Sequence, residues 1–228
     1  MKLSVMAGVL LAGVAFATAC GSTPAPAAAP APVAPAAAKV TSSTPPADLR
    51  AGLNRLFEEH VYLAMGATSA ALGGRTDEYK GAVAALDTNS TALGDAISSV
   101  YGKDAGAAFL AGWRRHIGFF VDYTNGVANK DEAAKAQAVT NLGQYAQDLA
   151  ELLNGANGLP KDTVVSLVKS HAGVLCSIID LQAGPDRMAQ FAKTRVGAEQ
   201  IHQIADPIAE ATVLKFPDKF AAPATASR

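Results

Sequence analysis

The chain has 228 residues, with 19 Lys and Arg against 20 Asp and Glu, and therefore a net charge of −1. Basic residues are not clustered, so the charge pattern argues against a nucleic-acid-binding surface, and we expect no nucleic-acid partner. Apolar residues make up 50% of the chain and β-branched runs are short, which indicates a helix-rich folded protein.

The first 19 residues are typical of a signal peptide. Lys2 supplies the positive start, and residues 3–19 form an apolar stretch that is too short to be a transmembrane helix. The following letters, ATACG at 17–21, resemble the lipobox of bacterial lipoproteins. The resemblance implies cleavage before Cys20 and attachment of acyl chains such as palmitate through its sulfur. The alternative is an ordinary secretory peptide cut near Ala19, which leaves a free thiol.

Residues 20–47 are predicted to form a linker. They are mostly Pro, Ala, Ser and Thr, as in STPAPAAAPAPVAPAAA, and such a segment cannot bury a core. Two or three acyl chains hold a protein stably on a bilayer. We therefore expect a protein anchored to a cell membrane on its extracytoplasmic side, in the periplasm or at the cell surface. The membrane is its expected partner, with another envelope protein as a further candidate.

Residues 48–220 are predicted to form one helical-bundle domain, and residues 221–228 a disordered tail. Apolar residues recur at the three- and four-residue spacing of a helix face. In three segments, LFEEHVYLAMG, WRRHIGFFVDY and VKSHAGVLCSI, this stripe contains a histidine. His60, His116 and His171 are separated by 56 and 55 residues (116 − 60 and 171 − 116), which indicates three copies of one unit.

Each histidine helix is followed by a predicted second helix. Gly73, Asn129 and Gly184 stand at equivalent positions, and Gly and Asn tolerate the left-handed end of a helix. New helices are expected to start near Thr76, Asp131 and Asp186. The sequence therefore predicts an all-α bundle of three tandem helical hairpins with six main helices, and Pro207 is expected to kink the last one. A closed bundle is favoured over a solenoid, because three units leave little to cap.

The three histidines are the candidate site, and three interpretations remain open. In the first, the residues 29 positions after each histidine pin each hairpin through a buried hydrogen bond to the imidazole. These residues are Asn89, Tyr145 and Gln200. In the second, the imidazoles of His60, His116 and His171 converge on a transition metal such as zinc or copper, or on iron, with the same three polar residues behind them. In the third, they line a polar pocket for a small organic ligand.

Motifs for catalysis are missing from the sequence, so we expect a binding protein and not an enzyme. It has no GxSxG, no Cys–His signature and no glycine-rich phosphate loop. With Cys20 lipidated, Cys176 has no disulfide partner, and its neighbours favour a small buried apolar residue over a thiolate ligand near His171. His202 lies off the apolar stripe and is expected at the surface.

Four motifs carry a family resemblance: LFEEHVY at 56–62, SVYG at 99–102, IADP at 204–207 and FP at 216–217. They resemble a group of uncharacterised bacterial lipoproteins and secreted helical proteins with a histidine in each of three hairpin repeats. The resemblance implies that the three histidines are shared with the group, and it implies no activity. The expected function is a membrane-anchored lipoprotein that binds a ligand, with a metal ion as the first candidate. The alternative is a non-catalytic structural or partner-binding envelope lipoprotein whose histidines only pin helices.

Overall fold

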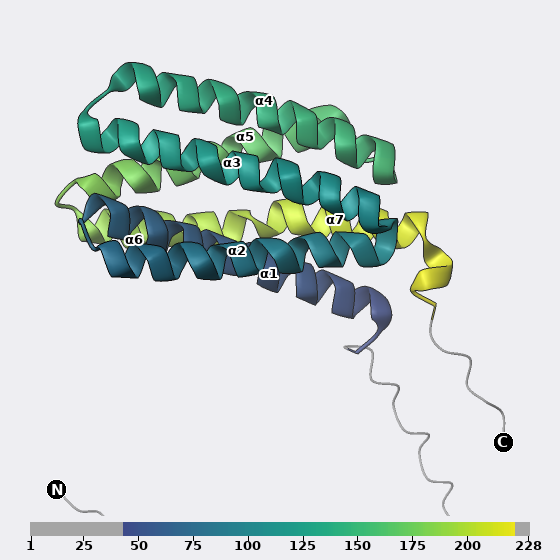
Figure 1. Cartoon of the computed structure of the whole chain (residues 1–228). Coiled ribbons are helices and arrows are strands. Elements are labelled where there is room, and N and C mark those ends of the chain that lie inside the picture. The colour runs from purple at the N-terminus through teal and green to yellow at the C-terminus, as the bar shows by residue number, and fades with distance from the viewer. Residues whose placement is uncertain (1–42, 222–228) are drawn as a thin grey trace, which may run out of the picture. The chain divides into compact units, whose positions relative to one another are not determined.

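The computed structural model describes residues 43–221, and this part of the chain forms seven α-helices and no strand (Figure 1). The predicted signal peptide, Cys20, the linker up to residue 42 and the tail from residue 222 lie outside the described residues. The helices are α1 (Pro45–Leu72), α2 (Thr76–Tyr101), α3 (Lys103–Asn129), α4 (Glu132–Asn157), α5 (Lys161–Ala183), α6 (Arg187–Gln200) and α7 (His202–Lys215), followed by the 3₁₀ turn η1 (Pro217–Lys219).

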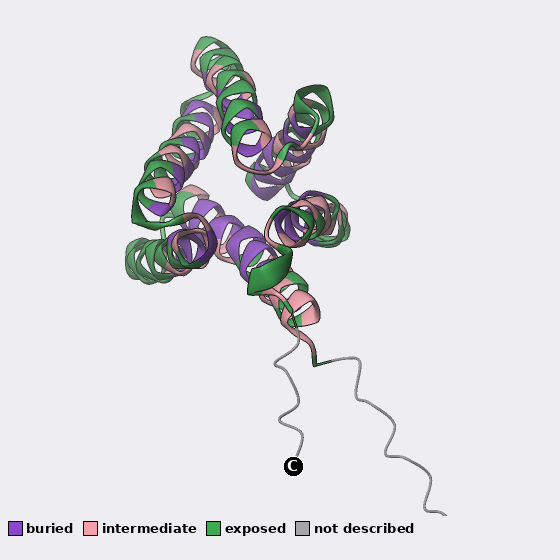
Figure 2. Cartoon of the chain, turned by 90° about the vertical axis from the view of Figure 1, so that its right-hand side faces the viewer, coloured by how far each residue is buried: buried purple, intermediate pink, exposed green. Residues whose placement is uncertain are grey.

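The helices form three tandem hairpins that close into one bundle. α1 pairs with α2, α3 with α4, and α5 with α6 and α7, while α2 packs on α3 and α4 on α5. The last helix, α7, returns to pack against α1, so the two ends of the bundle meet (Figure 1). Seen along the helices in Figure 2, the buried faces point inward and the exposed faces outward. The predicted all-α bundle is confirmed.

Side-chain caps set the starts of several helices. Thr44 accepts a hydrogen bond from the backbone N–H of Ala47 at 3.4 Å, and Pro45 opens α1, so the first helix begins three residues before the predicted domain boundary at residue 48. Asp131 caps α4 and Asp186 caps α6, accepting from backbone N–H groups at 3.0 and 2.9 Å. The two aspartates therefore lie where the sequence placed the helix starts.

The left-handed helix ends are one residue later than predicted, or absent. Gly74 (φ 65°) and Lys130 (φ 56°) adopt this conformation, in place of Gly73 and Asn129. Gly184 is extended, with φ −92° and ψ 178°. The predicted left-handed stops at Gly73, Asn129 and Gly184 are therefore wrong in position, because the chain adopts the left-handed conformation at the next residue in the first two turns and leaves α5 extended in the third.

The predicted sixth helix is divided into α6 and α7 at Ile201. The division does not occur at Pro207, where a kink was expected. Ile201 is buried and separates α6 from α7, while Pro207 lies inside α7. Proline removes the hydrogen bond to the carbonyl four residues earlier, which here belongs to Gln203 in the first turn of α7. The backbone hydrogen bonds of this helical segment are therefore interrupted twice, at Ile201 and at Pro207. The segment divides into two helices at Ile201, whose side chain is buried in the core.

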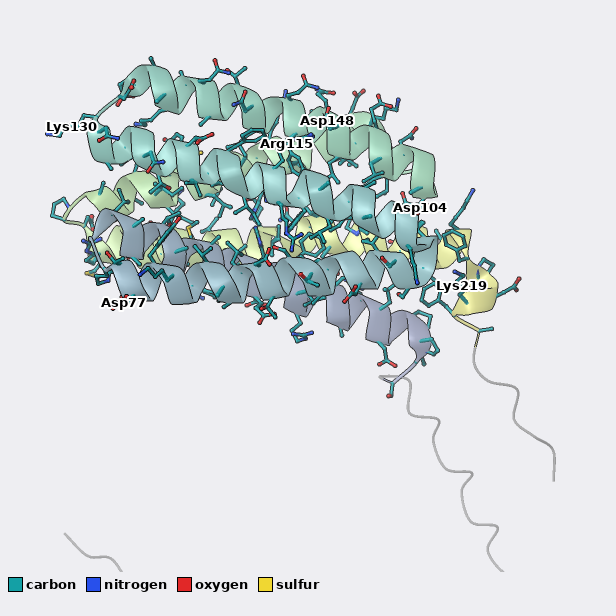
Figure 3. All side chains as sticks on the ribbon, viewed as in Figure 1. Asp77, Asp104, Arg115, Lys130, Asp148 and Lys219 are labelled. Atoms are coloured by element: carbon teal, nitrogen blue, oxygen red, sulfur yellow. The ribbon has the colours of Figure 1, made fainter. Side chains whose placement is uncertain are left out.

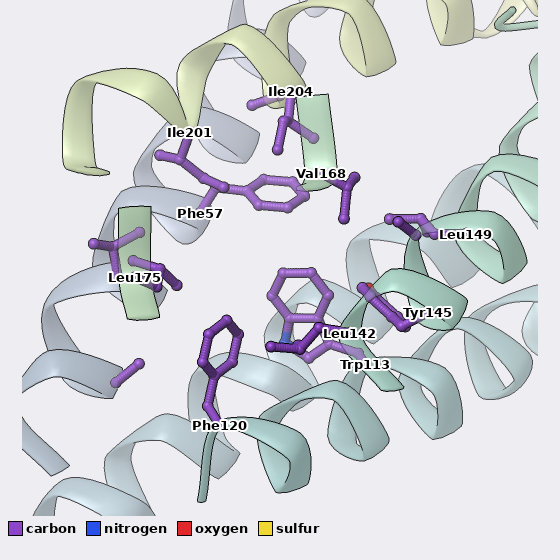
Figure 4. Close-up of a cluster of buried hydrophobic side chains, with 14 of the residues drawn as sticks. Phe57, Trp113, Phe120, Leu142, Tyr145, Leu149, Val168, Leu175, Ile201 and Ile204 are labelled. Carbon is purple, nitrogen blue, oxygen red and sulfur yellow. The ribbon is translucent and has the colours of Figure 1, made fainter. Parts of the chain in front are cut away.

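The core is aromatic at its centre and aliphatic around it. Figure 4 shows Trp113 at the centre of the cluster, with Phe120 and Tyr145 on either side of it and Phe57 near Ile201. Charged side chains lie on the outside, where Arg115 of α3 and Asp148 of α4 form an ion pair at 2.9 Å (Figure 3). One described helix, α5, is long and apolar enough to span a membrane by length and composition, and here it contributes buried side chains to the bundle.

Candidate functional site

The structure brings the three predicted histidines to one place. His60, His116 and His171 come from α1, α3 and α5, and their exposed fractions are 2%, 6% and 8%. All three line one small cavity with a volume of about 40 Å³. The ring centroids of His60 and His116 lie 5.4 Å apart. We call these three residues the histidine cluster.

Aromatic and aliphatic side chains enclose the histidine cluster. Trp113 packs against two of its members, with its ring centroid 4.6 Å from that of His60 and 4.4 Å from that of His116. Tyr145 stacks on His116 at 4.6 Å, with 16° between the ring planes. Trp113 precedes His116 by three residues on the same apolar stripe, so the helical spacing predicts that the two rings lie side by side, although Trp113 was not predicted as part of the site.

Several polar atoms around this cavity have no hydrogen-bond partner within residues 43–221. They are Nδ1 of His60 and His116, both ring nitrogens of His171, Nε1 of Trp113 and the hydroxyl of Tyr145. An unpaired buried polar atom costs about 1–3 kcal/mol of stability. Most buried polar groups in proteins are paired, so a group of unpaired ones around one cavity is a feature that a bound ligand would explain.

The environment keeps the cluster uncharged. Burial lowers the pKa of His116 to about 3 and that of His171 to about 4. The pKa of His60 lies well below its usual range, first because of burial and then because a proton on either other histidine repels its own. All three imidazoles are therefore neutral at pH 7, which is the form that binds metal ions.

The polar residues predicted to pin the hairpins behave differently from one another. Asn89 donates to the carbonyl of Leu56 at 2.9 Å and to the carboxylate of Glu59 at 3.0 Å, so its amide is used away from His60. Tyr145 contacts its histidine by stacking, and its hydroxyl is unpaired among the described residues. The predicted hydrogen bonds to His60 and His116 are therefore not formed.

Gln200 forms its hydrogen bond beside its histidine and not with it. Both ring nitrogens of His171 and the amide oxygen of Gln200 have no hydrogen-bond partner among the described residues, so the predicted bond between the two side chains is not formed. The same amide donates Nε2 to Ser170 Oγ at 2.7 Å. Gln200 therefore joins α6 to α5 next to His171, which helps to fix the position of α5 beside the cavity.

Cys176 lies apart from the histidine cluster. It is buried, and burial raises the pKa of its thiol to about 12, so it stays protonated at neutral pH. Its side chain borders a separate groove between α4 and α5. Within the described residues, no group of three His, Cys, Asp or Glu side chains is arranged so that it could hold a metal ion.

Comparison with known proteins returned no matching family model, no matching curated protein and no matching solved structure. The resemblance to a family of histidine-containing bacterial lipoproteins therefore stays a prediction. The function of the chain has to be argued from its own residues.

Proposed function

We propose that this protein is a membrane-anchored bacterial lipoprotein of the extracytoplasmic side, whose helical bundle binds a transition-metal ion at His60, His116 and His171. The observation that carries the proposal is the grouping of three neutral, buried imidazoles with unpaired nitrogens around one cavity. The anchor is supported by the lipobox at Cys20 and the Pro- and Ala-rich linker after it. Its function is binding, and no reaction is proposed.

The size of the cavity favours an ion over an organic molecule. A cavity needs about 10–15 Å³ to hold one water molecule. The space beside the histidine cluster, about 40 Å³, has room for an ion with one or two waters. Organic ligands usually need pockets of about 300–1,000 Å³.

The donor set suits zinc, copper or iron. Neutral imidazole nitrogens are common ligands of all three metals, and three of them leave a position for water or a further ligand. Because the side chains are not placed to hold a metal as they stand, binding must include rotation of at least one imidazole. A bound ion would supply the positive charge that pairs with these buried nitrogens.

A second candidate is a structural or partner-binding envelope lipoprotein, whose histidines only pack helices. The stacking of His116 on Tyr145 and its contact with Trp113 favour it, since the imidazole here packs as an aromatic ring. In this case the unpaired nitrogens are a cost that the surrounding core offsets.

Metal titration separates the two candidates. The mature protein is purified without an affinity tag, its metal content is measured, and it is titrated with Zn²⁺ and Cu²⁺. Trp113 is the only tryptophan of the chain and touches two of the three histidines, so its fluorescence reports copper binding at this place. We expect one equivalent of metal, a raised melting temperature and quenching of Trp113.

Two histidine variants complete the test. His171→Leu is expected to abolish metal binding and the quenching. His202→Asn is the matched control, because His202 is partly exposed and pairs with Glu58 at 3.2 Å. A protein without metal, whose melting temperature ignores excess zinc and copper, would support the structural candidate instead.

The anchor has its own test. Cys20→Ser is expected to move the protein from the membrane fraction to the soluble fraction and to remove labelling by a palmitate analogue, while the bundle stays folded. Retention of both in the variant would show that the membrane attachment does not use Cys20.

A further inference from the structure

A second and larger cavity lies between α1, α2 and α3. Its volume is about 390 Å³, and its walls include His60, Ala64, Ala67, Leu86, Ile117 and Phe120. Along α1 it extends from His60 to Ala71, which is 11 residues (71 − 60) or about 16 Å at 1.5 Å per residue. We call it the α1–α2–α3 groove. It is long, and its volume falls within the range of pockets for small organic molecules.

Small apolar side chains keep the groove open. Ala64, Ala67 and Ala71 follow one another along α1 and form one wall. Val83 and Leu86 of α2 form part of the opposite wall. An alanine wall leaves room that a leucine or phenylalanine at the same positions would fill, so the groove depends on these alanines.

The charges at the groove cancel each other. Arg114 donates to the carboxylate of Asp87 at 2.8 Å across its rim, and also to Thr91 at 3.4 Å. Neither group is therefore left as a single charge for a charged ligand to pair with.

The buried hydroxyl groups of the groove are already used as donors. Thr68 donates to Gln182 at 2.7 Å, Ser90 to the carbonyl of Leu86 at 2.7 Å and Thr124 to a backbone carbonyl of its own helix at 2.7 Å. His60 is different, because its Nδ1 has no partner in the described part of the chain and 98% of the residue is buried. His60 is also shared with the smaller cavity of the histidine cluster.

We propose that the α1–α2–α3 groove is a second binding site, for an elongated, uncharged and mostly apolar molecule whose one hydrogen-bonding group lies at His60. The apolar walls contribute the affinity through burial, and the paired charges at the rim give a charged head group no partner. This site goes beyond the proposed metal site, because it is a separate cavity. The two sites share His60 and Phe120, so a ligand in the groove contacts one member of the histidine cluster.

Calorimetric titration of the mature protein with 1-octanol and with octanoate at pH 7.5 tests the assignment. The two probes have the same apolar chain and differ in the charge of the head group. We expect octanol to bind saturably at one equivalent and octanoate to bind at least ten-fold more weakly. Octanol that fails to saturate, or octanoate that binds as well as octanol, overturns the proposal.

Variants locate the binding in the groove. Ala67→Leu fills the middle of the groove and is expected to weaken octanol binding at least ten-fold, and Ala71→Leu, at the exposed end, to weaken it less. Val139→Leu on α4 is the control, because Val139 is half-exposed and lies outside the groove. Circular dichroism checks that each variant folds, and unchanged affinity in folded Ala67→Leu contradicts the proposal.

Copper titration of Ala67→Leu keeps the two proposals distinguishable. This variant retains all three histidines and is expected to bind copper as the unmodified protein does. If the unmodified protein binds octanol but no metal, the proposed groove site is supported and the proposed metal site is contradicted. Metal binding without octanol binding has the opposite meaning.

Discussion

The imidazole of His116 stacks on the phenol ring of Tyr145, with ring centroids 4.6 Å apart and planes 16° apart. The two residues come from α3 and α4, so the contact joins the two helices of the second hairpin. The hydroxyl of Tyr145 is buried without a partner among the described residues, and burial raises its pKa above the ordinary value. Ring packing therefore orients this imidazole, and its Nδ1 stays available to a ligand.

Stability should fall as the pH is lowered below the ordinary histidine value. The folded-state pKa values of His116 (about 3) and His171 (about 4) lie below the unfolded value near 6.5, so the unfolded chain binds more protons in this range. The stabilisation is fully present above pH 6.5 and is lost between pH 6.5 and about 3–4. We expect a loss of about 2 kcal/mol per buried histidine between pH 6.5 and 5, measured by urea unfolding. A flat free energy of unfolding across this range would contradict the burial of the cluster.

His171→Leu should separate stability from function. Both ring nitrogens of His171 are unpaired in the described structure, so an apolar residue of similar size removes their cost. We expect the free energy of unfolding at pH 7.5, without metal, to stay the same or rise by about 1–2 kcal/mol, and the pH dependence to weaken. Val168→Ala, one turn earlier on α5, is the control and should lose roughly 2 kcal/mol. A comparable loss in His171→Leu would show that the imidazole stabilises the fold.

Gly106→Ala should disrupt the contact between α2 and α3. A Cβ atom at Gly106 would lie 1.8 Å from Ser98 Oγ and 2.7 Å from the carbonyl oxygen of Gly94. The hydroxyl can rotate away, but the backbone carbonyl cannot, so the helices must separate at a cost of about 1–3 kcal/mol. Gly118→Ala on the same helix meets no atom within 4 Å and should instead gain about 0.5–1 kcal/mol. Thermal unfolding of both variants checks the prediction, which fails if the two shifts have the same sign.

The buried pair of Thr68 and Gln182 should be energetically coupled. Thr68 donates to Gln182 Oε1 at 2.7 Å, and Gln182 donates to the carbonyl of Met65 at 2.9 Å, which joins α1 to α5. Thr68→Val leaves the buried amide oxygen unpaired and should cost about 1–3 kcal/mol. In a double-mutant cycle with Gln182→Met, the double variant should lose less than the sum of the single losses. Additive losses would show that the two side chains stabilise the bundle independently.

The interval between the histidines was sufficient to predict the hairpins, because a helical stripe and a turn must recur whenever the unit is copied. The same interval was not sufficient to predict the hydrogen-bond partners of the histidines, because these depend on how far the second helix of each hairpin is rotated about its axis. The 29-residue offset placed Asn89 on the facing helix, but its amide reaches the carbonyl of Leu56, one turn before His60. Spacing along the chain sets the height of a residue on its helix, whereas packing between helices sets its direction.

Two further features depend on tertiary packing. The break between α6 and α7 lies at the buried side chain of Ile201, and no glycine or proline stands at that position in the sequence. The α1–α2–α3 groove exists because Ala64, Ala67 and Ala71 leave volume between helices. Alanine has a high helix propensity in any setting, so its presence does not tell a tight helix contact from an open groove.

The contact between α7 and α1 gives the copy number of the repeat a direct meaning. Each hairpin brings one imidazole to a common cavity, and each also supplies part of the enclosing wall. A chain with two hairpins would have neither the third nitrogen donor nor the closure that keeps water away from the other two. The cavity is thus a collective property of three units, and shortening or lengthening the array by one hairpin would remove it without changing any single unit.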